Sequence, residues 1–109
     1  TAILASDDSV AAVVMKTIQE RGLRVPDDVA VVGVDDQPFA PLLNPSLTTV
    51  KLPILQAGQK AIELLTERLR GGRTAPERVV LPMELIVRAS SGAMRTTAAL
   101  DPADPALPV

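Results

Sequence analysis

The stretch GLRVPDDVAVVGVDDQPFAPLLNPSLTTV, residues 22–50, decides the fold of this chain. It opens with a glycine, the residue best suited to the left-handed position that ends a helix. Its centre, residues 29–34 (VAVVGV), is apolar and β-branched, which is typical of a parallel strand buried on both faces. Asp35 and Asp36 follow where this strand meets solvent. Open α/β sheets bind ligands at the carboxyl ends of such strands, so the stretch predicts a fold class and a candidate site together.

Strands and helices alternate on both sides of this central strand. The alternation indicates an α/β protein with a mostly parallel sheet flanked by helices. Two main helices and three to five strands make only a thin core for a chain of 109 residues. The elements are expected at residues 2–5 (buried strand), 9–21 (helix), 29–34 (strand), 37–44 (one helical turn), 47–51 (strand), 53–70 (amphipathic helix) and 78–88 (one or two strands).

The helix expected over residues 9–21 carries apolar residues on more than one face. Ala11 and Met15 extend its apolar surface beyond the main stripe, onto an adjacent face. Four residues recur at helical spacing and predict the side turned to the core: Val10, Val13, Val14 and Ile18.

The composition excludes several classes of function. The chain has no cysteine and no histidine, which removes thiolate metal sites, the usual zinc ligand and the usual general base. The net charge is −2 and the basic residues are scattered, so direct DNA binding by this segment is not expected. No apolar stretch has membrane-spanning length and no signal-peptide pattern opens the chain. We expect no metal, no cofactor, no membrane contact and no catalysis, although carboxylates alone leave a magnesium site and acid-base chemistry as alternatives.

Two pairs of acids are the candidate chemistry. Asp7 and Asp8 follow the first strand, and Asp35 and Asp36 follow the central one, so a parallel sheet would bring both pairs to one edge. Helix capping and turn formation explain such residues without any ligand. Recognition of a polyol is the first functional alternative, because a carboxylate accepts hydrogen bonds from neighbouring hydroxyls. A magnesium site is a second alternative, but no glycine-rich phosphate loop accompanies it.

Three segments together resemble a known family: AILASDDSVAAVVMKTIQERGLRVPDDVAVVGVDD, NPSLTTVKLPILQAGQKAIELL and LPMELIVRASS. Their order and spacing are similar to the C-terminal third of bacterial transcription regulators of the lactose-repressor (LacI/GalR) family. The resemblance covers residues 2–91. It implies a partial periplasmic-binding-protein-like (type I) fold and a C-terminal fragment, an expectation that the abrupt start at Thr1 also favours.

The resemblance implies a division of labour along the chain. Residues 1–50 would belong to the second of two subdomains that flank an effector cleft. Residues 53–77 would form a crossover helix that packs on the first subdomain, and residues 78–91 the terminal strands. Residues 92–109 would be an irregular or disordered tail. Operator DNA would be bound by a helix-turn-helix domain outside this chain, in a cytoplasmic homodimer that responds to a small sugar-like effector.

The resemblance also implies roles for single residues. Asp35 would hydrogen-bond the effector, Asp7 would face the same cleft, and Asp8 would cap the following helix. Leu52 and Ile54 would stand on the cleft wall where the chain returns to the first subdomain. Six residues would lie at the dimer interface: Ala11, Met15, Pro38, Phe39, Leu42 and Leu43. The competing interpretation is a transporter-linked periplasmic sugar-binding protein of the same fold.

Overall fold

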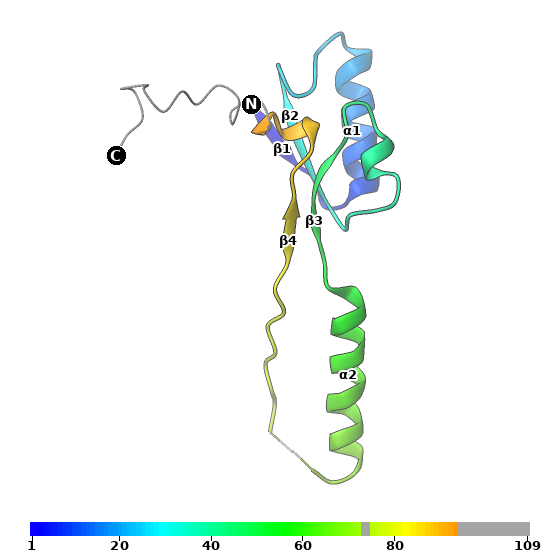
Figure 1. Cartoon of the computed structure of the whole chain (residues 1–109), viewed down its shortest axis with the longest axis vertical. Coiled ribbons are helices and arrows are strands. Elements are labelled where there is room, and N and C mark those ends of the chain that lie inside the picture. Colours follow the sequence, from blue (N-terminus) through cyan, green and yellow to red (C-terminus); the bar gives the residue numbers. More distant parts are fainter. Residues whose placement is uncertain (73–74, 94–109) are drawn as a thin grey trace, which may run out of the picture. The chain divides into compact units, whose positions relative to one another are not determined.

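The computed structural model describes residues 1–72 and 75–93. The elements run alternately as the sequence predicts (Figure 1). The helical turn expected over residues 37–44 is a short 3₁₀ turn, and a second 3₁₀ turn follows the last strand. In chain order they are β1 (Ala2–Leu4), α1 (Asp8–Glu20), β2 (Ala30–Val34), η1 (Ala40–Leu42), β3 (Thr48–Lys51), α2 (Ile54–Leu69), β4 (Glu84–Ile86) and η2 (Ala89–Ser91).

The described residues form two compact units. The first contains Thr1–Lys51 together with the described residues from Leu85 onward, and the second is Leu52–Glu84. One sheet has the strand order β1-β2-β3-β4, with β2 parallel to both β1 and β3. β4 runs in the opposite direction beside β3 (Figure 1). The predicted α/β class and the central position of the strand after residue 29 are confirmed.

Helix α1 covers one face of this sheet, and its ends follow from local chemistry. The Asp7 side chain accepts a hydrogen bond from the Val10 amide (2.9 Å), so Asp7 is the N-cap. Gly22 adopts a φ of 75° just after the helix, as its sequence position predicts. The core beneath α1 is small and aliphatic: Ala5, Ala11, Met15, Ile18, Val25, Val31, Ala40 and Leu47.

The prediction of which residues of α1 turn inward was right for two of the four: Ile18 is buried in the core and Val14 packs against it. Ala11 is 0% exposed and Met15 is 3% exposed, and both belong to the core of the first unit. Val10 and Val13, assigned to the core, are exposed instead. The cause is the sheet beneath, because β2 presents Gly33 to the helix and its missing side chain leaves room only for the small Ala11. Ala11 therefore has no surface to offer a second copy of the chain, and Met15 has almost none.

Strand β1 is also less buried than its apolar sequence predicts. Ile3 and Leu4 are both exposed, the latter to 73%. The reason is position, because β1 is an edge strand of the described sheet and has only β2 as a neighbour. An apolar run indicates which residues avoid water, but it does not say which surface covers them.

The second unit is an uncovered helix followed by an extended segment. No residue of α2 is buried, and several of its large apolar residues face solvent: Ile54, Leu55, Ile62, Leu65 and Leu69. Only residues 84–86 of the segment expected to form one or two strands are a strand. The tail predicted over residues 92–109 lies almost wholly outside the described residues. No helix among those residues is long and apolar enough to cross a membrane.

Candidate functional site

The two acidic pairs meet at one edge of the sheet, as the parallel topology predicts. β1 and β2 end side by side, with Leu4 level with Val32, and each strand is followed by its pair of aspartates. A direct hydrogen bond joins the two segments, since the Gln37 amide donates to Asp8 Oδ2 (2.7 Å). Residues 29 positions apart in the sequence thus form one polar cluster at the carboxyl end of the central strands.

Asp8 is the buried centre of this cluster, and its predicted role was wrong. The helix cap is Asp7, whereas Asp8 lies in the first turn of α1 and is fully buried. Its other oxygen, Oδ1, accepts from the Thr49 hydroxyl (2.5 Å). The helix begins one residue earlier than expected, which turns the second aspartate inward towards β2 and β3 instead of along the helix end.

The turn after β2 has a backbone that few sequences adopt. Asp35 and Asp36 both have positive φ, 108° and 51°. Asparagine and aspartate tolerate the left-handed region better than most residues, but a φ near 108° is strained for any side chain with a Cβ. The Asp35 amide continues the ladder of β2 by donating to the Val50 carbonyl (2.8 Å). The strain therefore sits at the residue from which the candidate effector carboxylate projects.

Asp36 has a structural role. Its Oδ1 accepts from Arg88 Nη2 (2.7 Å), and both side chains are 19% exposed. Arg88 Nη1 also donates to the Leu47 carbonyl (2.9 Å), and the Arg88 backbone exchanges two hydrogen bonds with the Thr48 hydroxyl. Arg88 thus forms a structural ion pair, and the returning chain after β4 is bound to both β3 and the turn.

Asp35 and Asp7 are the two acids left at the surface of the cluster. Both are partly exposed, and no hydrogen bond or ion pair of the Asp35 side chain occurs among the described residues. At Asp7, the hydrogen bond from the Val10 amide lowers the pKa of the carboxyl below its ordinary value. Two carboxylates at one strand edge form an acceptor-rich surface suited to hydroxyl groups.

A shallow groove lies on the other side of α1. Its volume is about 490 Å³, and η1 and the chain after it form its second wall. Of the residues predicted for a dimer interface, Pro38 and Leu42 are exposed, whereas Phe39 and Leu43 are half-buried. The groove is lined by Ala12, Val13, Met15, Lys16, Gln19, Leu42, Leu43 and Asn44.

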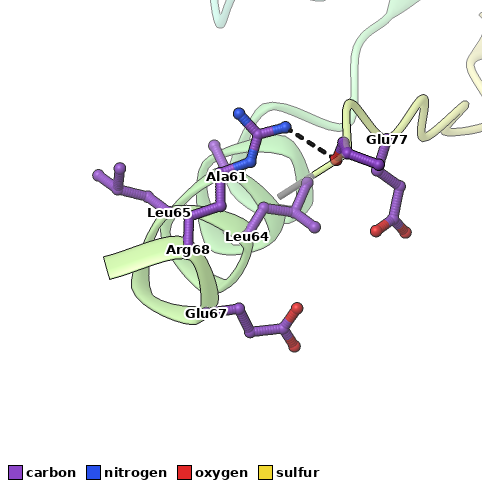
Figure 2. Close-up of a pocket in the computed structure, with 7 residues that line it drawn as sticks. Ala61, Leu64, Leu65, Glu67, Arg68 and Glu77 are labelled. Carbon is purple, nitrogen blue, oxygen red and sulfur yellow. Dashed lines mark hydrogen bonds between the residues drawn. The ribbon is translucent and has the colours of Figure 1, made fainter. Parts of the chain in front are cut away.

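The second unit holds the predicted cleft-wall residues and a pocket of its own. Leu52 is half-buried and Ile54 is exposed. Figure 2 shows the pocket, of about 270 Å³, between α2 and the segment after it, where Arg68 donates to the Ala75 carbonyl (3.2 Å). None of the residues predicted for ligand contact lines this pocket.

Sequence reasoning missed Thr49 and Gly33. A Cβ at Gly33 would collide with Asp8 Oδ1, so the glycine inside β2 makes room for the buried carboxylate. Two adjacent threonines in a short strand were the available signal, because buried hydroxyls need partners. Within the described residues, no group of three acidic, histidine or cysteine side chains is arranged to hold a metal ion.

Comparisons with known proteins agree on one family. Residues 1–91 match the family described as a periplasmic binding protein-like domain. The chain is 44% identical over 90 residues to a lactose operon repressor from Rhizobium radiobacter, covering 83% of this chain and 79% of that sequence. A transcriptional regulator CelR–cellobiose complex is 38% identical with a TM-score of 0.77, covering 82% of this chain and 27% of that one.

A second solved structure, a lac repressor dimer bound to operator and the anti-inducer ONPF, is 34% identical with a TM-score of 0.76. It matches over 84% of this chain and 32% of its own. The chain thus spans about a third or less of the two solved regulators. These relatives are regulators of transcription rather than enzymes. The sequence match and the fold together assign this chain to the LacI family of transcriptional regulators, within its periplasmic-binding-protein-like domain.

Proposed function

We propose that this chain is the C-terminal part of the effector-binding core of a LacI-type regulator, and that its polar cluster binds a sugar or sugar derivative. The observation that carries the proposal is Asp35, whose carboxylate stands at the end of the central strand without an internal partner among the described residues. A charged acceptor held there offers strong hydrogen bonds to adjacent hydroxyls. Asp7 supplies a second acceptor from the neighbouring strand end.

The other wall of the cleft would come from a first subdomain that this chain does not supply. The exposed apolar face of α2 supports this part of the proposal, because contiguous apolar surface of this kind marks an interaction site. Leu52 and Ile54 would stand at the crossover on the cleft wall. Ligand binding would favour one relative orientation of the subdomains, which the regulator would convey to a helix-turn-helix domain on operator DNA.

The groove beside α1 would be the contact with a second copy of the chain. Its exposed residues Val13 and Leu42 are apolar, and the neighbouring Pro38, Phe39 and Leu43 would extend the contact. The similar solved structure of a lac repressor dimer bound to operator supports the proposal that this regulator is a dimer. The alternative, a transporter-linked sugar-binding protein, is not favoured because the relatives compared are regulators. A cytoplasmic location would follow from action on DNA.

Sugar titration of the full-length regulator tests the site. Asp35→Asn keeps the side-chain size and tolerates positive φ, so it removes the charge with little effect on the turn. We expect it to weaken lactose or cellobiose binding by at least about tenfold, the value of one charge-assisted hydrogen bond. Asp27→Asn, an exposed acid in the loop before β2, is the matched control. Equal affinity for wild type and Asp35→Asn would return Asp35 to the role of a turn residue.

A further inference from the structure

One buried acid has no place in the effector contact just proposed. Asp8 is 0% exposed, and a buried carboxylate is costly unless hydrogen bonds compensate it. Both of its oxygens accept such bonds, one from the Thr49 hydroxyl and one from the Gln37 amide. These donors lie on β3 and on the turn after β2, so Asp8 ties α1 to the segment that carries Asp35.

Thr49 extends this connection to the next residue of the turn. Its hydroxyl donates to Asp8 and at the same time accepts from the Asp36 amide (3.3 Å). The Asp35 amide is bound to the Val50 carbonyl. Three successive amides, at positions 35, 36 and 37, therefore have fixed acceptors. Two of the three acceptors depend on the Asp8–Thr49 pair, which holds a turn whose positive φ angles would otherwise disfavour it.

The neighbouring strand leaves space for this arrangement. Any side chain at Gly33 would meet Asp8 Oδ1, and its Cβ would also stand 3.1 Å from Leu47 and 3.3 Å from Ala11. The missing side chain at Gly33 therefore leaves the space that Asp8 Oδ1 occupies. The hydrogen bonds from Thr49 and Gln37 hold the carboxylate in that space.

We propose that Asp8 and Thr49 are positioning residues of the effector site: they fix the turn over residues 35–37 so that the Asp35 carboxylate is in place before ligand arrives. This inference rests on the proposed function. Neither residue needs to touch the effector. When only a fraction of molecules holds the competent turn, the apparent affinity falls by that fraction. Loss of either side chain therefore weakens binding without removing a ligand contact.

Calorimetric titration of the full-length regulator with lactose tests the proposal. We expect Thr49→Val to weaken binding roughly three- to tenfold through a smaller population of the competent turn, and Thr49→Ser, which keeps the hydroxyl, to remain within about twofold of wild type. Asp8→Asn should weaken binding as Thr49→Val does, because the amide group presents a donor where an acceptor is required. Ser90→Ala is the matched control, since Ser90 is a buried hydroxyl bonded to Val31 and Thr48 and not to the turn.

Amide hydrogen exchange without ligand provides a second readout. The amides of Asp36 and Gln37 should exchange faster in Thr49→Val than in wild type, and at the wild-type rate in Ser90→Ala. This measurement decides the positioning claim even where lactose fails to bind the wild type.

The outcomes separate the two proposals. If Asp35→Asn abolishes lactose binding while Thr49→Val and Asp8→Asn bind and exchange like wild type, the positioning inference is overturned and the effector site stands. If Asp35→Asn binds like wild type, the effector site is overturned. Equal weakening by Thr49→Val and Ser90→Ala would reduce Thr49 to a stability role and also overturn the inference.

Discussion

Arg88 joins three segments of the first unit through a single side chain. Its guanidinium binds the Asp36 carboxylate and the Leu47 carbonyl, and the Asp36 side chain is only 19% exposed. We expect Arg88→Met to lower the free energy of unfolding by about 1–3 kcal/mol, because it leaves a largely buried carboxylate without its charged partner. Arg88→Lys should recover only part of this loss, since an ammonium group cannot reproduce the two-point geometry.

Urea unfolding of the full-length regulator measures this effect. Arg24→Met is the control, because Arg24 is 70% exposed and its ion pairs with Asp27 and Asp28 are screened by solvent. A loss of stability no larger for Arg88→Met than for Arg24→Met would contradict the assignment of Asp36 to a structural role.

Asp7 gives the helix start a dependence on pH. Hydrogen bonding from the Val10 amide lowers the pKa of the Asp7 carboxyl below 3.8, so the unfolded chain binds a proton there more tightly. The contribution of the charged cap is therefore complete above the unfolded pKa and is lost as the pH falls through the folded pKa. The unfolding temperature of wild type should exceed that of Asp7→Asn near neutral pH, and the difference should shrink as the pH falls through the lowered pKa of Asp7. A difference that stays constant with pH would refute this account.

The sequence was enough to locate the acidic residues of the site, but not to assign the role of each one. The acids at both strand ends were identified from the sequence, but the helix cap is Asp7 and not Asp8, which is buried instead. A shift of one residue in the helix start turns a side chain by about 100°, and sequence patterns do not fix element ends to that precision. Thr49 and Gly33 were missed because their function depends on a buried group 25 or more positions away.

Two glycines inside regular elements have opposite surroundings. A Cβ added at Gly33 in β2 would meet Asp8, Leu47 and Ala11. A Cβ added at Gly58 in α2 would have no atom within 4 Å outside the helix's own backbone. We expect Gly33→Ala to destabilise the protein by about 1–3 kcal/mol through overpacking. Gly58→Ala should be neutral or stabilising by up to about 1 kcal/mol, because alanine favours helix. Thermal and urea unfolding measure the stability of both variants. If Gly33→Ala is as stable as Gly58→Ala, Asp8 can move aside to make room for the added methyl group.

The elements themselves were predicted well where a local signal exists. Gly22 ends α1, and η1 occupies the segment between Pro38 and Asn44. The strand content of residues 78–88 was overestimated, because apolar residues there resemble a strand while only 84–86 have a strand beside them. Sheet formation depends on an available partner, which the segment's own sequence does not contain.

At the scale of the whole molecule, the apolar residues of this chain outnumber the surfaces it has to bury them. Leu4 on β1, Val13 on α1 and most of the apolar residues of α2 are exposed. Val10 and Val13 were wrongly assigned to the inward face of α1, because a helix with apolar residues on two faces does not reveal which one meets its own sheet. The family assignment supplies two candidates for the missing surfaces, namely a first subdomain and a second copy of the chain.

Charge substitutions distinguish these two surfaces. Leu42 is 81% exposed beside the groove on α1, and Leu65 is 57% exposed on α2. In a two-fold dimer, Leu42→Glu would bring two new carboxylates into one interface, so we expect the dimer dissociation constant of the full-length regulator to rise by at least about tenfold. Leu65→Glu should leave dimerisation unchanged and lower the unfolding temperature, because in the proposed arrangement it would place a charge between α2 and the first subdomain. Sedimentation velocity and thermal unfolding separate the two effects. Dissociation by Leu65→Glu together with an unaffected dimer in Leu42→Glu would exchange the two assignments and place the second copy on α2.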